Sequence, residues 1–230
     1  MSWMFPRSSG IHAPETREWI LGALYLPVFL FFLNFAILTY FPALGFPLTE
    51  PRNYFFANLL YMAVNFAVML LIFRRTLWQS LREFEGKMLL SVLIGFGMCY
   101  GANLVLTTAY TVLDIMPENY NQEAVNSLLG GYPLAMTLCT VVLAPLAEEC
   151  LFRGVLFAPL ARRCLPAAYA LSMFLFAGMH VFQFLGSMTA ANTILCLSLY
   201  LPASFSLCWV YQKTGNIWAS IFLHMFINFQ

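Results

Sequence analysis

Five ionisable side chains lie inside otherwise apolar stretches of this 230-residue sequence, where such groups are rare. They are Glu148, Glu149, Arg153, His180 and His224. An ionisable side chain at the centre of a membrane span costs roughly 2.5–3.5 kcal/mol on insertion scales. Carboxylates and imidazoles are also the groups that general acid–base chemistry uses. The five side chains therefore indicate a polar site within an apolar bundle.

Spacing separates the two adjacent glutamates. Glu149 and Arg153 are four residues apart and can pair along one face of a helix, whereas Glu148 is turned about 100° away and lacks that partner. Desolvation disfavours the ionised form of a carboxyl group, so such an acid can exchange a proton near neutral pH. His180 and His224 are its expected neighbours. The alternative is structural: an ion pair, with histidines that only pack or form hydrogen bonds.

Depth along the predicted helices places these groups at similar heights. The residues that mark the expected cytoplasmic border are Arg162, Pro166 and Asn216. At about 1.5 Å per residue, Glu148 and His180 each lie about 21 Å from this border. His224 lies about 12 Å and Asn228 about 18 Å from it. We therefore expect the four side chains to converge near the middle of the bilayer.

Composition requires a membrane around these residues. Residues of the AVILMFWYC set make up 61% of the chain and charged residues 9%, against roughly 25% charged residues in a typical globular domain. Mean hydropathy is +0.77. The net charge of +1 provides no basic face for phosphates, which excludes nucleic acid as a partner. The lipid bilayer is therefore an expected partner.

The apolar runs predict an all-α, polytopic transmembrane bundle of about seven segments. The predicted segments are Trp19–Phe41, Tyr54–Phe73, Met88–Leu113, Leu134–Leu160, Ala167–Phe184, Met188–Tyr211 and Ile217–Phe229. The last of them, at about 20 Å, is too short to cross cleanly. Apolar residues at helical spacing around Leu77–Phe84 predict a short interfacial helix. Gly97 and Gly101 predict close helix packing, and Glu118–Gly131 is expected to be an outer loop.

The basic residues predict the orientation of the bundle. One side of the membrane receives the basic residues Arg7, Arg17, Arg74, Arg75, Arg82, Lys87, Arg162, Arg163 and Lys213 if the loops alternate. The other side receives only Arg52. Lys and Arg are enriched in cytoplasmic loops, so the N-terminus is expected in the cytoplasm, and the plasma membrane is the expected location.

Counting excludes several protease mechanisms. Asp114 is the only aspartate, which excludes a two-aspartate mechanism, and no G-x-S occurs to favour a serine nucleophile. The helical zinc signature H-E-x-x-H is absent. A carboxylate and histidines that act on water, or on a metal ion, remain.

The remaining residues form three short motifs that resemble those of a known family. The motifs are Glu148-Glu149-x-x-x-Arg153, Phe176-x-x-x-His180 and His224-x-x-x-Asn228. In order and separation they resemble the CPBP intramembrane proteases, which include CAAX prenyl endopeptidases and bacterial proteins linked to bacteriocin processing and self-immunity. The resemblance covers roughly residues 133–230, so we expect a cytoplasmic lead over 1–18, N-terminal transmembrane helices over 19–132 and a CPBP-like catalytic core over 133–230.

The resemblance implies a role for each motif residue. Glu148, aided by His180, would activate a water molecule for attack on a peptide carbonyl. His224 and Asn228 would donate hydrogen bonds to the developing oxyanion. Glu149 and Arg153 would orient the site, with Phe176 in support. The resemblance thus implies an intramembrane glutamic endopeptidase without a cofactor, and its expected partner is a peptide or protein substrate at or in the membrane.

Three alternatives stay open. Glu148, His180 and His224 are also a plausible set of zinc ligands, which would make the chain a zinc-dependent membrane protease. The third motif lies two residues from the end of the sequence, which favours a non-catalytic scaffold or a bacteriocin immunity protein. Buried acids and histidines also suit a proton-coupled transporter, although no inverted repeat is present.

Overall fold

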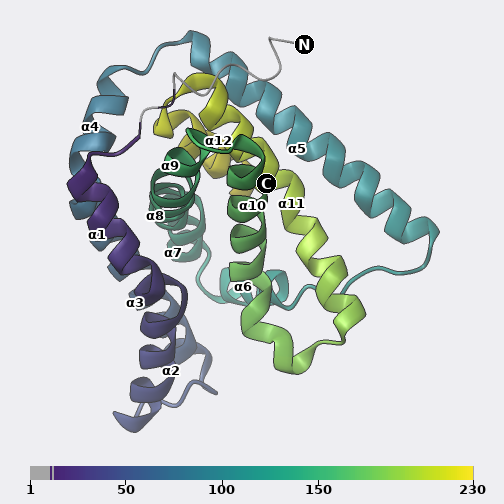
Figure 1. Ribbon diagram of the computed structural model, residues 1–230. Helices are drawn as coiled ribbons and strands as arrows, with labels where there is room; N and C mark the ends of the chain where they lie inside the picture. Colours follow the sequence, from purple (N-terminus) through teal and green to yellow (C-terminus); the bar gives the residue numbers. More distant parts are fainter. Residues whose placement is uncertain (1–10, 12, 230) are drawn as a thin grey trace.

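The computed structural model describes residues 11 and 13–229, and every regular element in this part of the chain is a helix (Figure 1). Six helical segments are long and apolar enough to cross a bilayer. They are Thr16–Ala43, Pro51–Ile72, Lys87–Val112, Pro133–Ala161, Leu165–Ser187 and Ala190–Thr214. Each corresponds to one predicted span, which confirms the all-α transmembrane bundle.

The six spans contain the following elements. The first consists of α1 (Thr16–Pro27), the π-helix η2 (Val28–Phe32) and α2 (Leu33–Ala43). The second is α3 (Pro51–Ile72) and the third is α5 (Lys87–Val112), with the short α4 (Arg74–Arg82) between them. The fourth consists of α7 (Pro133–Leu138), η3 (Cys139–Leu143), α8 (Ala144–Glu149), η4 (Cys150–Phe157) and α9 (Ala158–Ala161). The fifth is α10 (Leu165–Val181) with η5 (Phe182–Ser187), and the sixth is α11 (Ala190–Thr214).

The predicted short final segment is α12 (Ile217–Asn228). Its 12 residues span about 18 Å. At the other end of the chain, residues 1–10 and 12 of the expected lead, Arg7 among them, lie outside the described residues. The divisions placed after residues 18 and 132 stay predictions.

The fourth span lies at the centre of the bundle. Half of its most apolar window is buried, compared with 17–22% for each of the first three spans. Figure 1 shows α8 and α9 between α1–α3 on one side and α10–α12 on the other. Glu148, Glu149 and Arg153 therefore stand where most helices converge.

Two prolines explain why this central span is irregular. A proline inside a helix removes one backbone hydrogen bond and its ring clashes with a carbonyl on the preceding turn, and π turns relieve such clashes. In η3 the amide of Ala144 donates to Cys139 O, five residues back, and Pro145 has no N–H to offer to Thr140 in that register. A similar break occurs in η4 before Pro159.

Carbonyls within these two π-helices receive donors from other helices. Asn228 Nδ2 donates to Thr140 O at 2.9 Å. Trp19 Nε1 donates to Val155 O, four residues before Pro159, at 3.0 Å. Backbone polar groups inside a membrane must be satisfied by the protein, so these contacts fix α12 and α1 against the central span.

The turn between α11 and α12 holds α4 in place. Gly215, with φ 68°, ends α11 in the left-handed conformation that glycine adopts without strain. Asn216 caps α12 through its side-chain oxygen, and its Nδ2 donates to Ser80 O at 2.6 Å. Trp218 Nε1 donates to Leu77 O at 2.8 Å. The short helix predicted around Leu77 is confirmed, and its location at the membrane interface stays a prediction.

Glu18 holds the other end of α4. This buried carboxylate accepts hydrogen bonds from the amides of Arg75 at 3.0 Å and Thr76 at 3.2 Å, and from the Thr76 hydroxyl. A carboxylate at a helix N-terminus meets unpaired amides and the positive end of the helix dipole. Its burial is therefore compensated, and it has a structural role that sequence analysis did not assign.

The prediction of an outer loop over Glu118–Gly131 is wrong. This stretch contains the helix α6 (Tyr120–Gly131). Asn119 caps it by accepting a hydrogen bond from the Gln122 amide at 3.1 Å, and Glu123 lies in the first turn. Both residues are favourable at a helix N-terminus, so the sequence contained a helix signal here. The loop was predicted because the stretch is polar.

The prediction of close packing at Gly97 and Gly101 is also wrong. A Cβ atom at either position would meet nothing within 4 Å among the described residues. The closely packed glycine of α5 is Gly95, where a Cβ atom would lie 2.5 Å from Val210 Cγ2 and 2.9 Å from Leu223 Cδ2. The helices therefore meet at a face of α5 that the G-x-x-x-G pattern does not contain.

We predict that Gly95→Ala destabilises the protein by about 1–3 kcal/mol, because the added methyl group overpacks the contact with α11 and α12. Gly97→Ala is the matched control on the same helix and should leave stability unchanged or slightly raise it. Thermal unfolding of the two purified variants in detergent measures the difference. Equal melting temperatures would contradict the packing at Gly95.

Candidate active site

The most buried part of the candidate site is an ion pair between Glu149 and Arg153. Arg153 Nη1 lies 3.0 Å from Glu149 Oε1, and both side chains are 0% exposed. The pair joins residues four apart, as the spacing predicted. A buried charge is strongly unfavourable unless it is paired and hydrogen-bonded, so the arginine ties the carboxylate of Glu149 to its ionised state.

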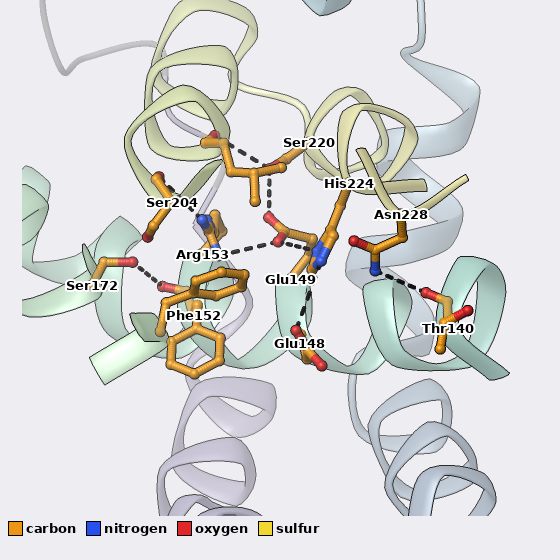
Figure 2. Close-up of polar contacts among 12 residues, drawn as sticks. Thr140, Glu148, Glu149, Phe152, Arg153, Ser172, Ser204, Ser220, His224 and Asn228 are labelled. Carbon is orange, nitrogen blue, oxygen red and sulfur yellow. Dashed lines mark hydrogen bonds and ion pairs between the residues drawn. The ribbon is translucent and has the colours of Figure 1, made fainter. Parts of the chain in front are cut away.

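Two residues of α12 complete the shell of Glu149. The Ser220 hydroxyl donates to Glu149 Oε2 at 2.5 Å, and His224 Nδ1 lies 2.9 Å from Oε1 (Figure 2). Ser220 and His224 are four residues apart, so they share one face of α12. Sequence analysis missed Ser220, although its spacing from His224 was a signal that could have found it.

Arg153 also contacts residues other than Glu149. Its Nη2 donates to Ser204 O at 3.3 Å. Its Cζ atom lies 5.1 Å from the ring centroid of Phe176 and 6.0 Å from that of Phe152, which are cation–π distances. The guanidinium group is thus enclosed by one carboxylate, one carbonyl and two aromatic rings, which makes it a fixed element of the site.

Glu148 stands in a different environment from its neighbour. Figure 2 shows its carboxylate pointing away from that of Glu149, with a dashed line that joins it to His224. Glu148 is 9% exposed, and its buried Oε2 has no hydrogen-bond partner among the described residues. The nearest ionisable partner is His224, whose Nε2 lies 3.8 Å from Oε2. Glu148 therefore lacks the arginine partner of Glu149, as the spacing predicted.

The backbone and Glu149 determine which nitrogen of each histidine is available. His180 Nδ1 lies 2.8 Å from the carbonyl oxygen of Phe176, which can only accept a hydrogen bond. His224 Nδ1 meets the carboxylate of Glu149, which also accepts. Both Nδ1 atoms therefore carry hydrogen, and in the neutral ring Nε2 is the acceptor.

Phe176 is the packing centre around which these groups are arranged. Its ring centroid lies 4.9 Å from that of His180 and 5.5 Å from that of His224. Phe176 is 2% exposed. One rigid ring therefore sets the spacing between the two imidazoles and also covers the guanidinium of Arg153.

Asn228 is the exposed member of the set. Its side-chain nitrogen donates one hydrogen to Thr140 O. An amide nitrogen carries two hydrogens, so one donor remains for another acceptor. The contact with the Thr140 carbonyl holds this amide beside α8, the helix that carries Glu148.

A cavity of about 520 Å³ unites the predicted site residues. Glu148, His180, His224 and Asn228 all line it, with Phe176. Its other walls come from α2, α3, α5, α6 and α11. Glu149 and Arg153 lie behind this wall and do not line the cavity. Glu148 is the sole Asp, Glu, Lys or Arg residue among the described residues that do.

The side chains that the zinc alternative would use as ligands are not grouped as a zinc site requires. Within the described part of the chain, no three His, Cys, Asp or Glu side chains are close enough together to hold a metal ion. Glu148, His180 and His224 share the cavity wall but do not form such a group.

We predict that two neighbouring glutamates respond in opposite ways to the same substitution. Glu149→Gln should destabilise the protein by about 3–5 kcal/mol, because it leaves the buried charge of Arg153 without its partner. Glu148→Gln should change stability by less than about 0.5 kcal/mol, since Glu148 has no ion pair with an arginine or lysine. Melting temperatures in detergent compare the two, and equal losses would contradict this division.

Comparisons with known proteins agree with the motifs. A family model described as type II CAAX prenyl endopeptidase Rce1-like matches residues 130–230. A Bacillus subtilis (strain 168) protein named "Putative membrane peptidase YdiL" is 27% identical over 186 residues, which cover 77% of this chain and 72% of that protein. "UPF0177 protein YxdF" of Lactococcus lactis subsp. lactis (strain IL1403) is 27% identical over 127 residues, 55% of this chain and 65% of that protein. No solved structure gives a significant match. The matches confirm the predicted resemblance: over residues 130–230 the chain is similar in sequence to the Rce1-like family, which is consistent with the CPBP proteases.

Proposed function

We propose that the protein is an intramembrane endopeptidase in which Glu148 activates the attacking water. One observation carries this proposal: Glu148, whose buried Oε2 has no hydrogen-bond partner among the described residues, lines a cavity inside a membrane bundle. A buried polar atom without a partner is costly, so its position calls for a function. The family match and the peptidase name of the relative support hydrolysis of a peptide bond.

The first step is attack by water on the peptide carbonyl. The carboxylate of Glu148 accepts one proton of the water, while His180 Nε2 accepts a hydrogen bond from its second hydrogen. The water oxygen bonds to the carbonyl carbon and forms a tetrahedral intermediate. Glu148 then returns its proton to the amide nitrogen, the C–N bond breaks, and an acid and an amine leave.

The developing oxyanion needs donors during this step. The second N–H of Asn228 is available on the cavity wall. His224 donates from Nε2 when its ring carries a second proton, since Nδ1 is already committed to Glu149. One pre-positioned donor of this kind contributes about 2.7–4 kcal/mol in comparable sites.

We predict that Glu148→Gln lowers kcat for cleavage of a membrane-bound reporter peptide by at least about 100-fold. Glutamine keeps the size of the side chain but cannot accept the proton of the water. His180→Ala should lower kcat by a smaller factor, since it removes the second acceptor only. Quantified cleavage products from purified protein in lipid measure both.

Controls separate this mechanism from its alternatives. A metal assay on the purified protein and a parallel reaction with a chelator test the zinc reading, because chelation should leave cleavage unchanged if Glu148 alone activates the water. If Glu148→Ala and His180→Ala keep the full biological effect, the protein acts as a scaffold or immunity protein. Proton-dependent uptake into sealed vesicles would favour a transporter.

We further propose that the N-terminus and the basic loops face the cytoplasm at the plasma membrane. The distribution of Lys and Arg supports this orientation. The basic residues Arg162 and Arg163 lie next to Cys164 in the loop before α10, on the side proposed to be cytoplasmic.

Cys164 provides a direct test of orientation. It is the exposed cysteine, whereas the other five are buried. A membrane-impermeant maleimide should therefore label the protein in inverted vesicles but not in intact cells. Cys164→Ser is the control that should abolish labelling, and labelling in intact cells would reverse the orientation.

A further inference from the structure

The N-terminal end of α6 lies along one face of α11. The residues of α11 that contact it are Asn192, Cys196 and Tyr200. They are spaced four apart, so they form a single stripe. Asn192 exchanges two hydrogen bonds with the backbone of Glu118, at 2.9 and 3.0 Å. The start of α6 is therefore anchored to α11 rather than loose above the cavity.

The hydroxyl of Tyr200 is the contact closest to the candidate active site. It donates to Asn119 Oδ1 at 3.0 Å and accepts from Asn121 Nδ2 at 3.2 Å. Asn119 Oδ1 also caps α6 by accepting from the Gln122 amide. The hydroxyl therefore meets both its partners only when the first turn of α6 is formed and in place.

The ring of the same residue lies against His180. The two ring centroids are 4.6 Å apart with an interplanar angle of 22°. His180 contacts Phe176 through a second ring contact and through its Nδ1 hydrogen bond. Both Tyr200 and His180 line the cavity. Rotation of the imidazole about χ2, which is otherwise a soft torsion, would break the stack and the hydrogen bond together.

We propose that Tyr200 is a positioning residue for His180, and that its hydroxyl makes this positioning depend on α6. The ring of Tyr200 keeps Nδ1 on the Phe176 carbonyl and leaves Nε2 for the cavity. The hydroxyl fixes the ring to Asn119 and Asn121. The catalytic consequence rests on the proposed function, in which Nε2 orients the water, whereas the orientation of the imidazole can be measured without any activity.

Two substitutions separate the ring from the hydroxyl. Tyr200→Phe keeps the stack and removes the link to α6, so kcat should fall about fivefold with little change in KM. Tyr200→Leu removes both, and kcat should fall about 50-fold or more. Tyr110→Phe is the matched control: it removes the hydrogen bond between another tyrosine and Ser198 of α11, outside the cavity, and should leave kcat unchanged.

A double-mutant cycle tests the route through α6. Asn121→Ala removes one of the two hydrogen bonds of the Tyr200 hydroxyl, so it should lower kcat by no more than Tyr200→Phe does. The double variant should be no slower than Tyr200→Phe alone, because that substitution has already removed the bond to Asn121. If the kcat reductions of the two single variants multiply in the double variant, the proposed link to α6 is wrong. Full kcat in Tyr200→Leu would overturn the positioning role.

The ¹⁵N chemical shifts of the His180 imidazole provide a second readout, and the signals that disappear in His180→Asn identify them. A loss of general stability would not change which nitrogen of this ring carries hydrogen. The shifts should report a single Nδ1–H tautomer in the wild type and in Tyr200→Phe, and exchange between tautomers in Tyr200→Leu. Unchanged shifts in Tyr200→Leu would overturn the inference. If the wild type cleaves nothing, or Glu148→Gln stays active, the proposed function fails, and these shifts alone then decide whether Tyr200 positions His180.

Discussion

The burial of the Arg153 guanidinium is the constraint on which the rest of the site depends. A charge without any exposure must keep a carboxylate within contact distance, and Glu149 is that carboxylate. Glu149 then carries the hydrogen bonds of Ser220 and His224 as well, so it has no oxygen left for a substrate. The adjacent Glu148 does not have to neutralise the charge of Arg153. Two identical side chains, one residue apart, therefore have different roles because an arginine lies four residues beyond one of them.

The same carboxylate also explains how a helix of only 12 residues stays in a membrane bundle. α12 is too short to be held by matching the bilayer thickness. Polar contacts hold it instead: Asn216 to Ser80 at its start, Ser220 and His224 to Glu149 in the middle, and Asn228 to Thr140 at its end. In a low-dielectric environment an unsatisfied partner is costly, so these contacts fix both the height and the rotation of the helix. These hydrogen bonds, together with the buried apolar side chains of α12, place His224 and Asn228.

Sequence alone was sufficient where the decisive interaction lies within one helix. The pairing of Glu149 with Arg153, the isolation of Glu148 and the six spans all depend on periodicity and average hydropathy, and these were predicted. Interactions between helices depend on the rotation of each helix, and the π turns before Pro145 and Pro159 change that rotation in a way that periodicity does not show. Gly97 was chosen where Gly95 makes the contact because the spacing of glycines does not show which face of α5 meets α11 and α12. Ser220 was missed although its spacing from His224 could have revealed it. α6 was missed because its polar residues face a cavity and outweighed its helix cap.

The site can be understood as two layers with opposite requirements. In the inner layer, the carboxylate of Glu149 is fully satisfied, which keeps it rigid and unreactive. In the layer that lines the cavity, His180 Nε2 and one N–H of Asn228 have no assigned partner among the described residues, and Glu148 and His224 contact each other only at 3.8 Å. Preorganised polar groups are effective in catalysis because they need not reorganise during the reaction. Such groups stay unsatisfied inside a folded bundle only when a neighbouring layer provides the stability, and the buried ion pair of Arg153 with Glu149 supplies it here.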